Sequence, residues 1–386
     1  MASRESHFAA DRLPAPLGRT PEDLAAWVAL SSVPGLGSAT LWNLIRAFGD
    51  LSQAWTASAA RLQAAGASPA VAKAVETARR EKSADHALEL LAKHNGRAIA
   101  WHDPAYPPQL REIPDPPPLI YVKGNLACAD YQRTVAIVGT RRMTAYGKQV
   151  TAQLAGTLAR AGICVVSGMA AGIDGEAHRA VLDAGGATVA VWGTGLHETY
   201  PRANRRLVPR ILERGAIVTE YPVGVRGLPE NFPQRNRIIS GLSLASIVIE
   251  APLESGALHT ARYAIEQNRE ILAVPGSVFA AASRGTNRLI NRGEARAVTS
   301  AEDVLEALQI AVSPEQLEMP QLVKPTTEER AALRHLTTEP MHIDELVRLT
   351  ALPAFRVSAL LAVMEVKGLV RNVGSAHYVT ALPHVE

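Results

Sequence analysis

The stretch Thr134-Val135-Ala136-Ile137-Val138-Gly139-Thr140-Arg141 decides the fold class. Residues 135–138 are β-branched or small and apolar, which predicts a buried strand, and the glycine that follows predicts a tight turn. Five more apolar runs come after it, each separated from the next by an amphipathic stretch of helical length. They cover residues 163–166, 188–192, 216–219, 247–250 and 271–274. Strands that are buried on both faces and alternate with helices predict an α/β fold with a mainly parallel, doubly wound sheet over residues 125–311.

The composition changes on both sides of this region. Residues 21–96 alternate alanine-rich and leucine-rich helical patterns and predict a small helical domain. Residues 97–124 are dominated by prolines and predict an extended connector that is not packed. On the carboxyl side, a linker is expected at 312–325. Residues 326–386 predict three helices and a hairpin, the pattern of a winged helix. The first 20 residues are expected to be loose.

The positive charge of the chain is concentrated in one segment. The 386 residues carry a net charge of only +3, so a nucleic-acid site would have to be a local patch. Residues 196–240 supply one, because they contain eight arginines, no lysine and four glutamates. Cys128 and Cys164 are isolated, which argues against disulfides or a thiolate metal site. No apolar run approaches the ~18 residues that span a bilayer, and no signal core is recognisable, so a cytoplasmic protein without membrane insertion is expected.

Within that segment, Asn231-Phe232-Pro233-Gln234-Arg235-Asn236-Arg237 predicts the start of a helix, with Asn231 as N-cap. Arg235 and Arg237 would then lie in the first turn, where a cation costs roughly 0.3–1 kcal/mol unless an anion is bound. Phe232 could stack a base, as in proteins that bind single strands without reading sequence, or could be the hydrophobic staple of the helix. The arginines could instead extend into solvent or pair with a carboxylate, in which case no anion is implied.

Three predicted strands run into turns rich in glycine and hydroxyl groups. Ligands of doubly wound sheets bind beyond the carboxyl ends of the strands, and backbone N–H groups near helix N-termini suit phosphate. Any one of these glycines could simply mark a tight turn, but several at one sheet edge favour a phosphate-binding groove. The residues concerned are Gly139, Thr140 and Arg141 after the first strand, Ser167, Gly168 and Met169 after the second, and Ser255 and Gly256 after the fifth.

The usual cofactor and catalytic motifs are absent from these turns. The first strand is not followed by G-x-G-x-x-G, and Gly147-Lys148-Gln149 lacks the rest of a P-loop. His197-Glu198 has no second histidine of a zinc helix, and no G-x-S-x-G elbow occurs. Asp174 is more simply an N-cap than a catalytic acid. The sequence therefore predicts no cofactor, no metal and no catalytic residue.

Taken in order, five motifs of this region resemble the DNA-processing protein A (DprA/Smf) family. They are Val135–Arg141, Ser167–Asp174 with Ala177-His178, Asn231–Ile239, Glu254-Ser255-Gly256 and Ala273-Val274-Pro275-Gly276. The resemblance implies an extended Rossmann-like domain between a helical domain and a winged helix. It also implies a DNA pocket made by Gly139, Arg141, Ser167, Gly168, Phe232, Arg235, Asn236, Ser255 and Gly256, to which the neighbouring Thr140, Met169 and Arg237 are added as candidates.

The function implied by the resemblance is that of a cytoplasmic recombination mediator. Such a protein binds single-stranded DNA, protects incoming DNA and loads the RecA recombinase onto it in natural transformation, with repair as a second setting. It would not be an enzyme and would need no cofactor. A homodimer through the Rossmann-like domain is implied as well.

Two other functions compete with this interpretation. Phosphoribohydrolases of a related Rossmann-like group carry P-G-G-x-G-T-x-x-E at the same turn, but Tyr263 stands here in place of the catalytic glutamate. An adaptor built on the end domains alone would leave the arginine-rich segment unexplained. Of those end domains, residues 33–37 could form a helix-hairpin-helix or a plain turn. Residues 321–386 balance seven basic against seven acidic side chains, which favours contact with protein or domain packing over a DNA groove.

Overall fold

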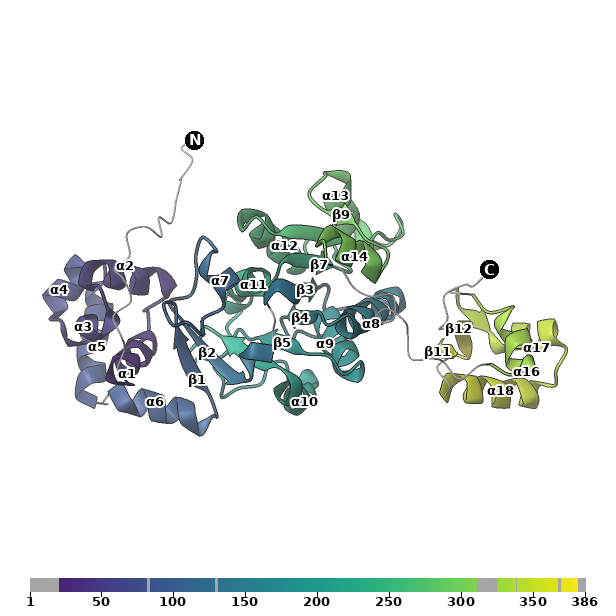
Figure 1. Ribbon diagram of the computed structural model, residues 1–386, viewed down its shortest axis with the longest axis horizontal. Coiled ribbons are helices and arrows are strands. Elements are labelled where there is room, and N and C mark those ends of the chain that lie inside the picture. Colours follow the sequence, from purple (N-terminus) through teal and green to yellow (C-terminus); the bar gives the residue numbers. More distant parts are fainter. Residues whose placement is uncertain are drawn as a thin grey trace. The chain divides into compact units, whose positions relative to one another are not determined.

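The structure is a computed structural model that describes residues 21–81, 84–128, 131–310, 325–337, 339–366 and 369–380. It divides into two compact units, residues 1–312 and residues 313–386, and each is described by itself (Figure 1). The predicted loose segment at 1–20 and all but the last residue of the predicted linker at 312–325 lie outside the described residues.

A nine-stranded sheet forms the centre of the first unit, in the order β1-β2-β6-β5-β4-β3-β7-β8-β9. The seven strands from β6 to β9 in this order are parallel, and β3 to β7 are buried along their whole length. The predicted doubly wound parallel sheet is therefore confirmed. The strands are β1 (Arg97–Ala100), β2 (Leu119–Gly124), β3 (Thr134–Val138), β4 (Cys164–Ser167), β5 (Thr188–Val191), β6 (Ala216–Thr219), β7 (Ala245–Val248), β8 (Glu270–Ala273) and β9 (Arg296–Ala297).

The expectation that residues 97–124 form an unpacked connector is wrong. This segment contains β1 and β2, which pair with each other in antiparallel fashion, and β2 continues the sheet by pairing with β6. The prolines that suggested a connector lie between the two strands, where a missing N–H costs no hydrogen bond of the sheet. Their carbonyls are used instead. The Trp101 N–H donates to the oxygen of Pro118 at 2.9 Å, and the Tyr106 hydroxyl donates to that of Pro117 at 2.8 Å.

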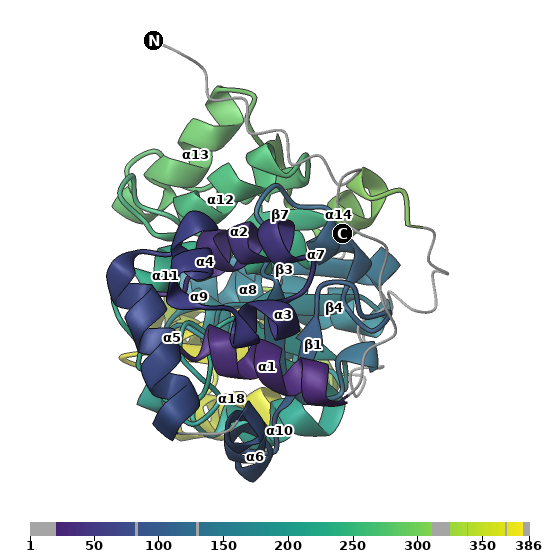
Figure 2. The same ribbon diagram turned by 90° about the vertical axis from the view of Figure 1, so that its left-hand side faces the viewer.

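Helices cover both faces of the sheet (Figures 1 and 2). The two faces have separate hydrophobic cores: Ile217 belongs to one, and its neighbours Ala216 and Val218 belong to the other, as the alternation of a strand requires. Ser300 caps the last helix of this unit in a capping box with Asp303. The helices are α7 (Pro108–Arg111), α8 (Ala145–Arg160), α9 (Ile173–Asp183), α10 (Leu207–Arg214), α11 (Asn231–Gly241), α12 (Ala257–Glu266), α13 (Arg284–Asn291) and α14 (Ala301–Ala307), with short 3₁₀ turns at Leu126–Cys128, Tyr131–Arg133, Arg202–Asn204 and Ala281–Ser283.

The N-terminal helices pack directly against the sheet, and Figure 2 shows them in front of it. Trp27 and Leu30 of these helices share a core with Tyr121 and Ile217 of the strands. The indole N–H of Trp42 donates to the carbonyl of Pro116 at 2.8 Å. The predicted helical region and the sheet therefore form one unit. The helices are α1 (Pro21–Ser31), α2 (Ser38–Phe48), α3 (Leu51–Thr56), α4 (Ala59–Ala64), α5 (Pro69–Glu81) and α6 (Ala84–Lys93).

The second unit has the three helices and the hairpin expected of a winged helix. A short strand that the sequence did not indicate, β10, completes a small antiparallel sheet in the order β10-β12-β11. The elements are α16 (Thr327–Leu333), β10 (Met341–His342), α17 (Ile343–Thr350), α18 (Ala354–Val366), β11 (Val370–Gly374) and β12 (His377–Thr380). No single described helix is long and apolar enough to cross a membrane. Among the described helices, α17 and residues 354–365 of α18 are together long and apolar enough, but this pair is bent by 111°.

Candidate nucleic-acid interface

A groove of about 440 Å³ lies at the carboxyl ends of β3 and β7. The chain runs from β3 to β4 on one side of β3 and later returns to place β7 on the other side. β3 is therefore the topological switch point, where doubly wound sheets bind ligands. A smaller cavity of about 80 Å³ shares Arg141, Phe232 and Arg235 with the groove and also reaches Gly168. Of the predicted residues, the groove is lined by Gly139, Thr140, Arg141, Phe232, Arg235, Asn236, Ser255 and Gly256.

Phe232 and Arg141 bring an aromatic face and a cation together in this groove. The Arg141 guanidinium lies 5.7 Å from the centroid of the Phe232 ring. The ring of Tyr200 lies 5.0 Å from that of Phe232, with 37° between the ring planes. Arg141 and the next residue, Arg142, are exposed, and neither forms an ion pair with another described residue. Their charges are therefore available to an anion.

Arg235 is buried, with only 4% of its surface exposed. Its guanidinium donates to the carbonyl oxygens of Gly168, at 2.6 Å, and Val191. Burial lowers the pKa of Arg235 to about 10, an effect that the nearby Asp174 opposes, so the side chain remains charged at neutral pH. Burial also raises the pKa of Asp174, and the charge of Arg235 limits that rise. Arg235 fixes α11 against the ends of β4 and β5 and contributes positive potential at the groove wall.

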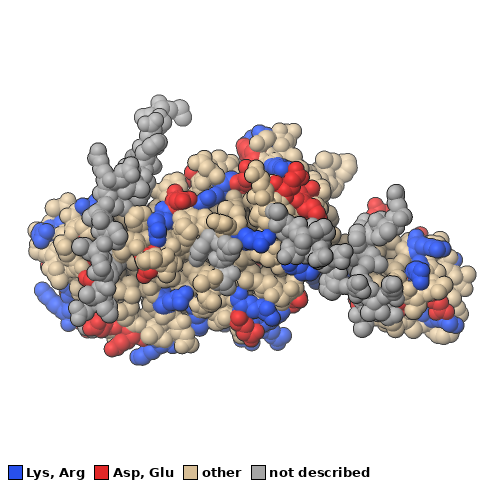
Figure 3. All heavy atoms as spheres, in the orientation of Figure 1, with Lys and Arg blue, Asp and Glu red and all other residues tan. Residues whose placement is uncertain are grey.

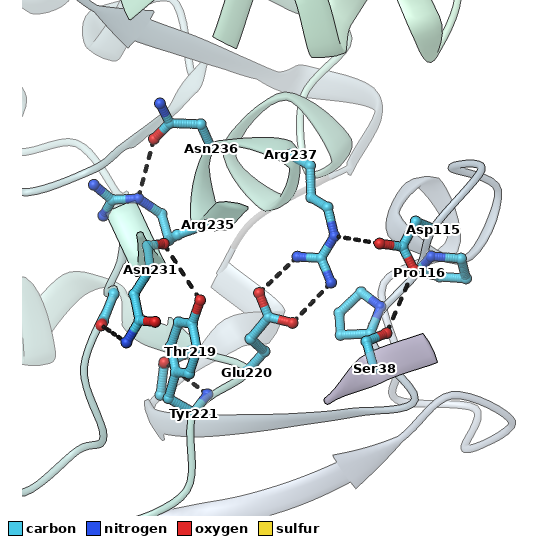
Figure 4. Close-up of polar contacts among 12 residues, drawn as sticks. Ser38, Asp115, Pro116, Thr219, Glu220, Tyr221, Asn231, Arg235, Asn236 and Arg237 are labelled. Carbon is cyan, nitrogen blue, oxygen red and sulfur yellow. Dashed lines mark hydrogen bonds and ion pairs between the residues drawn. The ribbon is translucent and has the colours of Figure 1, made fainter. Parts of the chain in front are cut away.

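Arg237 does not reach the groove, which contradicts its predicted place beside Arg235. It points to the other side of α11 and forms a bidentate pair with Glu220, at 2.6 and 2.7 Å (Figure 4). Its Nε donates to Asp115 at 3.2 Å. Burial alone would lower the pKa of Arg237, but the Glu220 carboxylate outweighs that effect and raises it. The interpretation that an arginine of this segment pairs with a carboxylate is therefore correct for Arg237.

The start of α11 also differs from the prediction. Asn231 is the first helical residue and Glu230 precedes it as N-cap, so both arginines lie in the second turn of the helix. The Asn231 amide donates to the carbonyl oxygens of Gly193 and Arg226, at 3.2 and 3.3 Å. The Asn231 side chain thereby joins the start of α11 to the loops that follow β5 and β6. The dipole argument for an anion at the arginines loses its force, because the effect fades beyond the first turn.

The last residue of β4 and the two that follow it make their contacts inside the protein. The Ser167 hydroxyl donates to the carbonyl of Ile137 at 2.6 Å, and Met169 lies fully buried in the core at a φ of 61°. Neither of the two lines the groove or the smaller cavity. A Cβ at Gly168 would lie 2.6 Å from the Arg235 guanidinium and 2.8 Å from the Asp174 carboxylate. Gly168 is therefore required where these two charged groups approach each other.

The turns after β3 and β7 leave their polar groups nearer to the groove. The Thr140 hydroxyl accepts from the Arg142 N–H at 3.2 Å, and the Ser255 hydroxyl accepts from the Ala257 N–H at 3.3 Å. Gly256 is exposed, and a Cβ placed on it would meet no atom within 4 Å. The Asn236 amide donates to the Gly256 carbonyl at 3.3 Å, joining the two walls of the groove.

Two features of this site were missed by the sequence interpretation. Tyr200 was not singled out, although Tyr200-Pro201 directly precedes a run of arginines that signals an exposed basic loop. Asp174 was expected to be an N-cap, but Gly172 holds that position. The Asp174 carboxylate instead accepts the N–H groups of Gly168 and Ala170, at 3.1 and 3.3 Å. Among the described residues, no group of three or more potential metal ligands is found.

Known proteins are similar to this chain in sequence and in architecture. The family model for DNA recombination-mediator protein A matches residues 97–309, and that for the DprA winged helix domain matches residues 315–374. The chain belongs to the DNA recombination-mediator protein A (DprA/Smf) family. It is 36% identical to the protein Smf of Synechocystis sp. over 390 residues, which cover 92% of this chain and 98% of that relative.

Two solved structures of DNA processing protein A are similar to this member of the DprA/Smf family. The one from Streptococcus pneumoniae has a TM-score of 0.64 at 33% identity and covers 75% of this chain and 98% of its own. The one from Helicobacter pylori, described for its single-stranded DNA binding mode, has a TM-score of 0.51 at 30% identity and covers 56% and 97%. The family resemblance is thus confirmed, and with it a recombination mediator that is not an enzyme.

The position of Tyr263 agrees with this outcome. Tyr263 lines a different cavity, of about 780 Å³, between the turn at 33–37 and α11 and α12. The residue that stands in place of the hydrolase glutamate is therefore not in the groove, and the phosphoribohydrolase alternative has no support in this geometry.

Proposed function

We propose that this DprA/Smf protein binds single-stranded DNA in the groove at the carboxyl ends of β3 and β7. The observation that carries the proposal is the Arg141 guanidinium above the Phe232 ring, because a cation beside an aromatic face can hold a phosphate while a base stacks. Gly139, Thr140, Asn236, Ser255 and Gly256 would line the path of the strand. Gly168, Ser167, Met169 and Arg235 would support this surface from below.

The cellular role that we propose is the protection of incoming DNA and the loading of the RecA recombinase onto it, in natural transformation and in repair. The protein would act in the cytoplasm, as a homodimer through its Rossmann-like unit. Membership in a family of recombination mediators supports this role. Its test is whether the protein restores the DNA-dependent ATPase of RecA on strands that are coated with a single-strand-binding protein, and analytical ultracentrifugation tests the dimer.

Fluorescence anisotropy with a labelled oligothymidine, measured over a range of salt concentrations, tests DNA binding. The variants are Arg141→Ala, Phe232→Ala and the double variant. We expect the wild type to bind at low salt with an affinity that falls steeply as salt rises. We expect the double variant to lose most of that affinity. An unchanged affinity would remove this groove as the site. Arg235→Ala is unsuitable here, because it would leave Asp174 buried without its neutralising charge.

A further inference from the structure

The loop that follows β5 forms an additional wall beside the groove. Tyr200 of this loop contacts Phe232 and, with Pro201, lines the smaller cavity that adjoins the groove. Tyr200 is 42% exposed, so part of its ring is open to solvent as well. The surface of the groove therefore continues from Arg141 across Phe232 to Tyr200 without a gap between the lining residues.

The loop is firmly attached to the turn that follows β4 and to the start of α9. The amide of Asn204, within the 3₁₀ turn Arg202–Asn204, donates to the carbonyl oxygens of Met169 and Ala170, each at 2.9 Å. The same side chain packs so closely on Gly175 that a Cβ there would lie 2.7 Å from it. Asn204 thus holds the loop against the start of α9, and the arginines on either side of it project from a fixed backbone.

Three arginines of this loop carry charge that no described carboxylate neutralises in an ion pair. Arg202, Arg205 and Arg206 are exposed, and none forms an ion pair with another described residue. Arg210 of the following helix differs, because it pairs with Asp183 at 2.7 Å. Figure 3 shows Lys and Arg side chains gathered over α10, with acidic atoms beside them. Arg202, Arg205 and Arg206 therefore form a cluster of cations ahead of α10 that have no ion pair with a described carboxylate.

We propose that Tyr200 and the three arginines, Arg202, Arg205 and Arg206, form a second segment of the DNA path. The inference rests on the proposed function of the groove and extends it. A strand held at Arg141 and Phe232 would continue over Tyr200, which offers a second stacking face, and its phosphates would then lie along the arginines. Cations that follow the backbone beside aromatic rings are the pattern of single-strand binding. An acidic protein surface could also bind the three arginines, but such a partner would not explain why the ring of Tyr200 lies against that of Phe232 in the groove.

The first test compares two triple variants by anisotropy with a long oligothymidine over a range of salt. Arg202→Ala/Arg205→Ala/Arg206→Ala removes the proposed contacts. Lys73→Ala/Arg80→Ala/Lys93→Ala removes the same charge from exposed positions on α5 and α6. Each phosphate contact on a single strand contributes about 0.7 to the slope of log K against log salt. We expect the slope of the first variant to be smaller than that of the wild type by roughly 2, and the slope of the second variant to be unchanged.

The second test concerns the ring of Tyr200. Tyr200→Ala should weaken binding about fivefold to a hundredfold without a change in salt slope, because stacking releases no counterion, and Tyr200→Phe should restore it. A strand that carries 5-iododeoxyuridine should crosslink to the peptide containing Tyr200, which a purely supporting role for this ring would not produce.

These measurements separate the further inference from the proposed function. A wild type that does not bind would remove both. If DNA binding depends on Arg141 but the two triple variants have equal slopes of log K against log salt, only the second segment of the DNA path is excluded. Loss of RecA stimulation by the arginine variant with its DNA affinity intact would assign the loop to a protein partner and also overturn the inference.

Discussion

Arg235 and Arg237 stand two positions apart on α11 and hold opposite sides of that helix in place. The Arg235 guanidinium binds backbone oxygens at the ends of β4 and β5. As Figure 4 shows, that of Arg237 binds Glu220 and Asp115. Residues i and i+2 differ by about 200° around a helix, so the two side chains cannot share a face. Neither guanidinium is free for a ligand. Their common effect is to fix the helix whose first turn carries Phe232.

Arg237→Ala should destabilise the protein strongly, since it leaves Glu220 mostly buried without its partner. We expect a loss of about 3–5 kcal/mol in the free energy of unfolding, measured by urea denaturation. Arg210→Ala, which breaks the exposed pair with Asp183, serves as the control and should cost less than about 1 kcal/mol. Equal losses in the two variants would show that the Glu220 pair does not hold α11.

Gly168→Ala should destabilise the protein, whereas Gly256→Ala should leave its stability unchanged. A Cβ at Gly168 would collide with Arg235 and Asp174, so we expect a lower melting temperature and weaker DNA binding. A Cβ at Gly256 meets nothing within 4 Å, and its backbone is helical. That variant should keep the melting temperature, and any loss of affinity would then come from the groove itself. A stable Gly168→Ala variant would contradict the close approach of the two charged groups.

Arg141→Ala and Phe232→Ala, at the centre of the groove, should differ in how the DNA affinity of each variant depends on salt. Arg141→Ala should lower the slope of log K against log salt by about 0.7, because it removes one phosphate contact. Phe232→Ala should lower the affinity and leave the slope as it is, because stacking does not involve charge. Arg262→Ala, at an exposed position of α12 that does not line the groove, is the matched control. The same slope in all four proteins would exclude a phosphate at Arg141.

His178 should make the fold sensitive to acid. It lies fully buried, with Nδ1 2.7 Å from the Thr188 hydroxyl, and burial together with the charge of Arg235 lowers its pKa to about 3. The unfolded chain takes up the proton near pH 6.5, so stability that is present above that pH is lost as the pH falls towards 3. Between pH 7 and 4.5 the loss is about 2–3 kcal/mol.

Urea denaturation at both pH values, for the wild type and His178→Asn, measures this effect. The variant should lack this part of the pH dependence. His259→Asn, at an exposed position on α12, should behave as the wild type does. A His178→Asn variant with the full pH dependence of the wild type would assign the acid sensitivity to other groups.

Local patterns were sufficient for the regular elements of the sheet and of the winged helix. β6 has the predicted bounds, and the other five strands predicted for the doubly wound region lie within two residues of their predicted bounds, because buried strands and amphipathic helices have distinct periods. β1 and β2 escaped prediction because their pairing joins segments far apart in the chain, and the prolines between them suggested a connector. A strand that depends on a distant partner has a weak local signal.

The sequence by itself determined which turns meet at the switch point of the sheet, since parallel strands with helical crossovers bring their carboxyl ends to one edge. It thereby brought Gly139, Arg141, Phe232 and Ser255 to one groove. Only the tertiary structure decided which of the charged side chains remain free. The burial and the partners of a side chain depend on residues that are distant in the sequence and near in the folded protein. Arg235 and Arg237 are therefore buried and support α11, whereas Arg141 is exposed. For the same reason Tyr200, from a different loop, lies beside Phe232.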